Sequence, residues 1–139
     1  MNLLRIALII NGLAMFAWSF VLFFNHYGLW VAGEGRKLAS QKTPFDVMIW
    51  RIVGLWVAFV GVVSLLVADV GGIWSQQYGF SPDAMQPARS PLASLLALTH
   101  AAETCVKYKA LGPKGLSAFL QGASGNIVLG ALCLFGVLL

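Results

Sequence analysis

Three ionisable residues, His100, Glu103 and Lys107, interrupt an otherwise apolar stretch of the sequence. Their spacing of three and then four residues places them on one face of a helix. Ionisable groups in an apolar helix are costly, so they are functional candidates by default. Such a face can bind a ligand, a proton or a pigment, or it can only stabilise the packing of the helices.

Arg51 offers a structural use for this face. It lies in a separate apolar stretch, at a depth similar to that of Glu103 if the two segments run antiparallel. Paired charges inside a membrane commonly stabilise packing and insertion. We therefore expect an ion pair between Arg51 and Glu103, with His100 hydrogen-bonded nearby, and keep the ligand, proton or pigment site as the alternative.

Neither a metal site nor a catalytic site is expected. Transition-metal sites need three or four histidine, cysteine or carboxylate ligands, and the only other histidine is His26. The sequence lacks the H-E-x-x-H motif, a nucleophile elbow, a phosphate-cradling glycine loop and a Rossmann or kinase fingerprint. One histidine–glutamate face does not supply the arranged groups of an active site, so we expect no enzyme.

The composition indicates an integral membrane protein. Hydrophobic residues make up 59% of the chain and charged residues only 10%, whereas soluble domains carry about 25% charged residues. The hydrophobic excess falls in blocks, as membrane spans require. The net charge of +4 does not imply nucleic acid, because the nine lysines and arginines are too scattered to follow a phosphate backbone.

These blocks predict an all-α fold, an antiparallel bundle of four transmembrane helices in a single domain, 1–139. The third span is the most polar, and Ser90 followed by Pro91 predicts its start, as a capping serine and a proline at the first helical position. The four spans are expected at about residues 3–24, 47–68, 91–110 and 116–139.

The basic residues predict the orientation of these spans. With four spans, the loops 25–46 and 111–115 share one side of the membrane. That side and the adjoining helix ends carry seven basic residues, and the other side carries two, Arg5 and Arg89. The positive-inside rule then places both loops in the cytosol, stroma or matrix and both termini across the membrane. The seven are Arg36, Lys37, Lys42, Arg51, Lys107, Lys109 and Lys114.

The last span carries a stripe of mostly small residues at every fourth position. Small residues let helix backbones approach closely, and an asparagine among them can form a hydrogen bond to another helix. A similar small face in the second span is formed by Gly54 and Gly61. These faces indicate either packing within the chain or docking of a partner subunit. The stripe consists of Ala118, Gly122, Asn126 and Gly130.

Two motifs carry a family resemblance. The second span begins WRIVGLW at residues 50–56, and the third contains LLALTHAAE at 95–103, followed by VKYK and a glycine turn. Their order over roughly residues 43–130 resembles the ergosterol biosynthetic protein twenty-eight family, small four-span proteins of the endoplasmic reticulum. The resemblance implies a non-catalytic scaffold that tethers sterol-modifying enzymes. The positions that it carries over are Arg51, Gly54, Trp56, His100 and Glu103.

Three functions are therefore kept open. The first is a scaffold or accessory subunit that contacts membrane lipids and other membrane subunits, with no cofactor beyond a lipid. The second is a small subunit of a photosynthetic or respiratory complex in a thylakoid or mitochondrial inner membrane. The third is a small transporter or enzyme that uses His100 and Glu103. Only the second would bring chlorophyll, with its magnesium held by oxygen or nitrogen donors drawn from His26, His100, Glu103, Gln121 and Asn126.

Overall fold

The computed structural model describes residues 3–24, 43–81 and 84–139, and this part of the chain is almost entirely helical. It contains four long helices, one short helix and two single turns of 3₁₀-helix. The long helices are α1 (Leu3–Phe23), α4 (Pro44–Ala68), α6 (Gln86–Leu111) and α7 (Leu116–Leu138). The short helix is α5 (Ile73–Tyr78), and the 3₁₀ turns are η1 (Val70–Gly72) and η2 (Gly112–Lys114).

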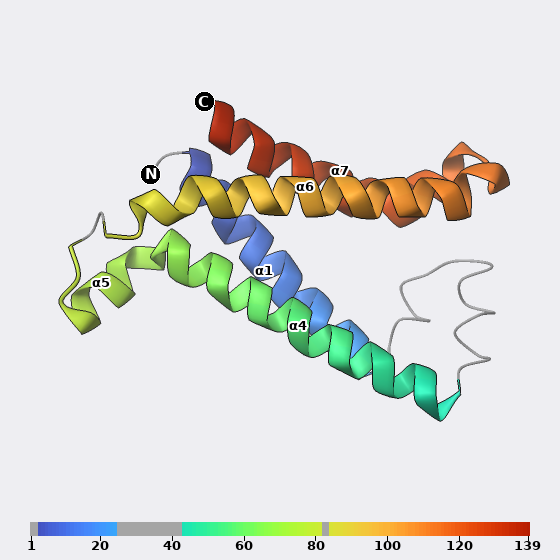
Figure 1. Ribbon diagram of the computed structural model, residues 1–139, viewed down its shortest axis with the longest axis horizontal. Helices are drawn as coiled ribbons and strands as arrows, with labels where there is room; N and C mark the ends of the chain where they lie inside the picture. Colours follow the sequence, from blue (N-terminus) through green and yellow to red (C-terminus); the bar gives the residue numbers. More distant parts are fainter. Residues whose placement is uncertain (1–2, 25–42, 82–83) are drawn as a thin grey trace.

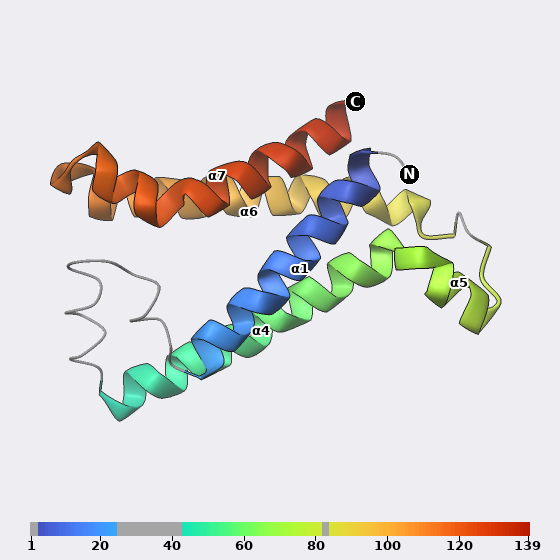
Figure 2. The ribbon, with the colours of Figure 1, turned by 180° about the vertical axis from the view of Figure 1, so that it is seen from behind.

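The long helices form two antiparallel pairs (Figure 1). Helix α1 packs along α4, and α6 packs along α7. The pairs contact one another mainly through α1, close to the start of α1 and the end of α7, and they diverge toward the opposite end. Figure 2 shows the same divergence from behind. The arrangement is therefore more open than the compact bundle that the sequence predicts.

The hydrophobic core lies where the two pairs meet. Five buried residues from all four long helices form it, and the ends of α1 and α7 close around it. Gly136 of α7 allows the close approach, since a Cβ there would lie 3.1 Å from the Leu4 Cα. The core residues are Leu8, Ala68, Ala93, Leu96 and Cys133.

Glycines set the spacing between α1 and α4. A Cβ on Gly61 would lie 2.9 Å from the carbonyl oxygen of Gly12, and a Cβ on Gly54 would lie 3.1 Å from that of Ser19. The two backbones therefore touch without side chains between them, as small residues permit in membrane helices. The small face of Gly54 and Gly61 thus lies against another helix of the same chain.

Local signals fix both ends of α4. At the start, the Thr43 hydroxyl accepts from the Asp46 N–H while the Asp46 carboxylate accepts from the Thr43 N–H, which forms a capping box, and Pro44 opens the helix. At the end, Asp69 adopts a left-handed conformation with φ of 49°. This box starts α4 three residues before the predicted Val47.

Helix α6 also begins earlier than the sequence predicts. It starts at Gln86, with Pro87 in its first two positions, and the predicted start Pro91 lies inside the helix. The first N–H groups of a helix have no intrahelical partner, so a proline there removes no bond. The added turn carries Arg89, whose Nε donates to the Val67 carbonyl of α4 at 3.1 Å.

Three helices, α1, α4 and α7, are long and apolar enough to cross a membrane. Their outward surfaces carry many exposed large hydrophobic side chains, which suits contact with lipid. Helix α6 is not among these three, because polar and charged residues such as Thr99, His100, Glu103 and Lys107 lie along it. The described part of the chain is thus α-helical with three candidate spans, which is consistent with a membrane protein.

Candidate functional site

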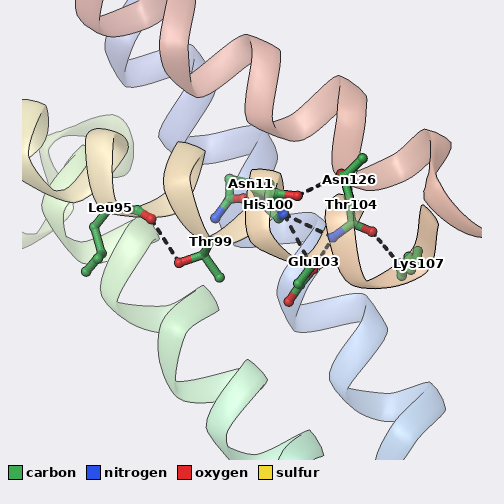
Figure 3. Close-up of polar contacts among 8 residues, drawn as sticks. All are labelled: Asn11, Leu95, Thr99, His100, Glu103, Thr104, Lys107 and Asn126. Atoms are coloured by element: carbon green, nitrogen blue, oxygen red, sulfur yellow. Dashed lines mark hydrogen bonds and ion pairs between the residues drawn. The ribbon is translucent and has the colours of Figure 1, made fainter. Parts of the chain in front are cut away.

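A network of polar side chains connects the four long helices, and Figure 3 shows the part of it that joins α1, α6 and α7. Asn11 of α1 donates from Nδ2 to the Ser64 hydroxyl of α4 at 3.4 Å, and its Oδ1 lies 2.8 Å from His100 Nε2 of α6. The other ring nitrogen of His100, Nδ1, lies 3.3 Å from Asn126 Nδ2 of α7. Asn11, Ser64 and His100 are buried, with 0–1% of each exposed.

The geometry assigns one proton position on His100. Asn11 Oδ1 can only accept, so His100 Nε2 carries the hydrogen and donates it. Nδ1 then accepts from the Asn126 amide. Both ring nitrogens of His100 therefore have a hydrogen-bond partner.

Asn126 extends this series of hydrogen bonds from the buried His100 to the more exposed Glu103 and Lys107 of α6. Its Nδ2 also donates to Glu103 Oε2, and its Oδ1 accepts from Lys107 Nζ. Glu103 Oε2 lies 3.8 Å from His100 Nδ1, and the Glu103 side chain is 47% exposed. The predicted face of His100, Glu103 and Lys107 is therefore brought together, with Asn126 as the residue that all three contact.

Hydroxyl groups within the helices support this arrangement. Ser64 donates to the Val60 carbonyl at 2.9 Å, and Thr104 donates to the His100 carbonyl at 2.7 Å. Thr99 in turn donates to the Leu95 carbonyl at 2.9 Å. A hydroxyl bonded to its own helix needs no outside partner, so Ser64 can accept from Asn11 while its own proton is used.

The stripe on α7 contributes to the same contact. A Cβ on Gly130 would lie 3.0 Å from His100 Cβ, and one on Gly122 would lie 2.5 Å from Leu111 Cδ1. Both glycines and Asn126 therefore face α6, while Ala118 is partly buried. The buried residues of α7 are Ala123, Cys133 and Gly136. None of them belongs to the predicted stripe.

The predicted ion pair between Arg51 and Glu103 is not formed in the described part of the chain. The Arg51 guanidinium carbon lies 5.9 Å from the ring centroid of Phe23 on α1, and Glu103 contacts Asn126 and His100. Arg51 lies in the first third of α4, and the two helix pairs diverge toward the start of this helix (Figure 1). The sequence predicts that Arg51 and Glu103 lie at a similar depth in the membrane. It does not predict that the α1–α4 pair and the α6–α7 pair move apart at that depth.

Of the five residues proposed as pigment ligands, His100, Glu103 and Asn126 lie together but are engaged with one another. Both nitrogens of His100 are hydrogen-bonded, Glu103 and Asn126 bond to each other, and Gln121 is exposed on α7. His26 lies outside the described residues. Among the described residues no group of three His, Cys, Asp or Glu side chains is arranged to hold a metal ion.

A second polar cluster lies at the end of α4. Arg5 donates from Nε to the Ala68 carbonyl at 2.9 Å and from Nη2 to the Asp69 carbonyl at 2.6 Å. Arg89 donates to the next carbonyl back, that of Val67. Cations near a helix C-terminus stabilise its exposed carbonyls and its dipole. Arg5 and Arg89, the two basic residues predicted to lie on the less basic side of the membrane, therefore both bind carbonyl groups at the end of α4.

Asp69 completes this cluster. Its carboxylate accepts from the Ser75 N–H at 3.2 Å and the Ser75 hydroxyl at 2.9 Å. Burial opposes ionisation of the carboxyl, but the hydrogen bonds from Ser75 and the nearby Arg5 outweigh it, and the pKa of Asp69 lies below its ordinary value.

A groove runs along the outer seam of α6 and α7. Its volume is about 650 Å³, and it is open to the surroundings. Small residues such as Ala97, Ala101 and Ala131 form part of its lining, together with the larger Leu98 and Ile127. This lining is almost wholly apolar, apart from Asn126, Thr104 and Ser94.

Sequence reasoning did not assign a role to Asn11, Ser64 or the Arg5–Asp69–Ser75–Arg89 cluster. A signal was present for Asn11, since an amide inside an apolar span must find a partner. Ser64 lies three residues after Gly61, on the α4 face that packs against α1. Comparison of the chain with family models, with curated proteins and with solved structures gives no match.

Proposed function

We propose that the chain is a four-span membrane protein in which α6 is the fourth span. Helix α6 has 26 residues, or about 39 Å at 1.5 Å per residue, and the hydrocarbon core is about 30 Å thick. A polar residue at membrane depth is tolerated when it faces other helices and is bonded there. His100, 1% exposed and bonded to α1 and α7, meets this condition.

The orientation follows from the same proposal. The loops 25–46 and 111–115 carry most of the basic residues and would lie on the cytosolic, stromal or matrix side. Single cysteines at Lys42, Lys114 and Leu139 test this in a variant without native cysteines. Positions 42 and 114 should react with an impermeant thiol reagent from one side, and position 139 from the other. Reaction of all three from one side would contradict four spans.

Within the membrane we propose a non-catalytic role as a scaffold or accessory subunit. The observation that carries it is the polar network from Ser64 to Lys107, in which buried and partly buried groups bond to one another across four helices. Groups used in this way hold the helices in register. A scaffold role also agrees with the resemblance to the ergosterol biosynthetic protein twenty-eight family, which would place the chain in the endoplasmic reticulum.

The groove between α6 and α7 is the proposed seat of the partner, a transmembrane helix of another subunit. Small residues in the lining would let a helix of the partner approach closely, and the larger lining residues Leu98 and Ile127 would contact its sides. Lipid chains would fill the groove in the absence of the partner.

Ala101→Leu tests the seat, because it fills the groove. Ala102→Leu is the matched control: it makes the same change on the next residue, which is also exposed but does not line the groove. Purification in mild detergent should recover a partner protein with the native chain and with Ala102→Leu, and much less with Ala101→Leu. Equal recovery with both variants, or a native chain that purifies alone, would reject the scaffold role.

A second candidate function, a proton-linked transporter or enzyme, is favoured by one observation. Glu103 is half exposed, while one of its oxygens lies 3.8 Å from His100 Nδ1, so a proton could pass between the carboxylate and the imidazole. A solitary protein that moves protons or a solute in vesicles, and loses that activity in Glu103→Gln, would favour this candidate. Coloured material that co-purifies would instead favour the organellar pigment-contacting subunit.

A further inference from the structure

The short helix α5 is held across the end of α4 by a specific set of contacts. Asp69, Gly71 and Gly72 have φ values of 49°, 66° and 70°, and this left-handed run turns the chain away from the direction of α4 (Figure 1). The Asp69 carboxylate then binds the buried Ser75 through its N–H and its hydroxyl. The orientation of α5 is therefore set by local backbone geometry and by a buried carboxylate.

The side chains that this arrangement presents are mostly aromatic or aliphatic, together with the exposed and uncharged Gln76 and Gln77. Ile73, Tyr78 and Phe80 are 56%, 60% and 52% exposed. The Trp74 ring stacks on Tyr78 with centroids 6.0 Å apart, and the Tyr78 and Phe80 centroids are 6.2 Å apart. No charged residue occurs from Val70 to Ser81. We call the surface formed by residues 73–80 the aromatic foot.

We propose that the aromatic foot lies in the boundary between headgroups and acyl chains of the bilayer, at the end of α4. Helix α4 is apolar and long enough to cross the membrane, and only Asp69 and η1 separate its last residue from α5. Only these four residues therefore lie between the end of this candidate span and the foot. Tryptophan and tyrosine concentrate at this depth because their rings are apolar and carry one polar group.

A lipid occupant accounts for the foot better than a protein partner does. A short, uncharged segment that exposes aromatic rings beside the amides Gln76 and Gln77 fits the interface without any specific complementary surface, because apolar and polar groups both find partners there. The position of Arg5 also suits this depth, since this partly exposed cation caps the end of α4 and can extend toward the headgroups. The foot then fixes the depth of α4, independently of any subunit bound to the groove.

Depth-dependent quenching of tryptophan fluorescence tests this proposal. The full chain is reconstituted in phosphatidylcholine vesicles with Trp74 as the sole tryptophan, the other four being replaced by phenylalanine. A second protein keeps only Trp56, which lies at the centre of α4 and is 66% exposed. The quenchers are lipids with a headgroup nitroxide and lipids brominated near the middle of the acyl chains.

Trp74 should be quenched more by the headgroup nitroxide than by the deep bromines, and Trp56 should show the opposite ratio. In the Trp74 protein, Asp69→Ala should reduce the preference for the shallow quencher, because the cap that orients α5 is lost. A Trp74 that no lipid-bound quencher reaches, but that aqueous acrylamide quenches, would overturn the proposal.

A spin label at Tyr78 gives a second measurement that leaves the tryptophans in place. Tyr78→Cys is labelled in a chain whose two native cysteines are replaced by alanine, and collisions with oxygen and with an aqueous nickel complex are compared. Contact with both, as at an interface, supports the foot. Contact with the nickel complex alone, or with neither, contradicts it.

Discussion

The contact between Asn11 and His100 should be the strongest single link among the helices. Asn11 is fully buried, and its Oδ1 lies 2.8 Å from His100 Nε2. Asn11→Leu keeps a similar volume and removes the acceptor, so a buried N–H of His100 is left without a partner. Such a loss costs about 1–3 kcal/mol.

The bond from Asn11 to Ser64 should contribute much less. Its length of 3.4 Å is close to the limit for a hydrogen bond, and the Ser64 hydroxyl keeps the Val60 carbonyl as a partner. Ser64→Ala should therefore cost less than about 0.6 kcal/mol, the average for hydrogen bonds between membrane helices. Unfolding of the purified chain in mixed micelles, titrated with a denaturing detergent, measures both values.

A double-mutant cycle separates the bond from the effects of packing. Asn11→Leu, His100→Leu and the double variant should give a coupling free energy between about 0.6 and 1.7 kcal/mol, the average and the maximum found for hydrogen bonds between membrane helices. The sign should show that the double variant is more stable than the sum of the single changes predicts. A coupling near zero, or a Ser64→Ala cost equal to that of Asn11→Leu, would refute the assignment of Asn11 and His100 as the central link.

Gly61→Ala should lower the free energy of unfolding by about 1–3 kcal/mol, as overpacking does, because its Cβ would meet the Gly12 carbonyl at 2.9 Å; Gly125→Ala, with open space around it, serves as the control and should not destabilise. Arg51→Gln and Glu103→Gln should be additive within about 0.3–0.5 kcal/mol in the same unfolding assay, as for residues that do not touch, and a clear coupling would restore the ion pair. The folded-state pKa of Asp69 lies below its unfolded value, so its contribution to stability is complete above the unfolded pKa and is lost as the pH falls through the folded pKa. Asp69→Asn should therefore flatten the decline of the melting temperature below about pH 4, and an unchanged pH profile would contradict the role given to Ser75.

The sequence by itself determined the positions of the long helices. Apolar blocks of about twenty residues predict helices over 3–24 and 116–139, and the structure has α1 at Leu3–Phe23 and α7 at Leu116–Leu138. Hydrophobic length is a local property, so it can be read without the fold. The predicted starts of α4 and α6 are wrong by a few residues. Helix α4 begins at the capping box of Thr43, before its apolar block, and α6 begins at Gln86, next to Pro87, and not at the second candidate, Pro91.

The sequence also grouped His100, Glu103 and Lys107 correctly on one helix face, because spacing along a helix fixes direction around its axis. Asn126 was identified as well, although as part of a packing stripe. The structure adds that this amide contacts all three side chains.

Only the tertiary structure decided which helices those faces meet. Asn11 and His100 are 89 residues apart, and no local pattern relates them. Arg51 and Glu103 were paired by depth alone, but helices can share a depth while crossing angles and rotations keep their side chains apart. Glycine contacts hold α1 against α4, and the contact between His100 and Gly130 holds α6 against α7. Because the two helix pairs diverge, Arg51 lies beside Phe23 and Glu103 lies beside Asn126.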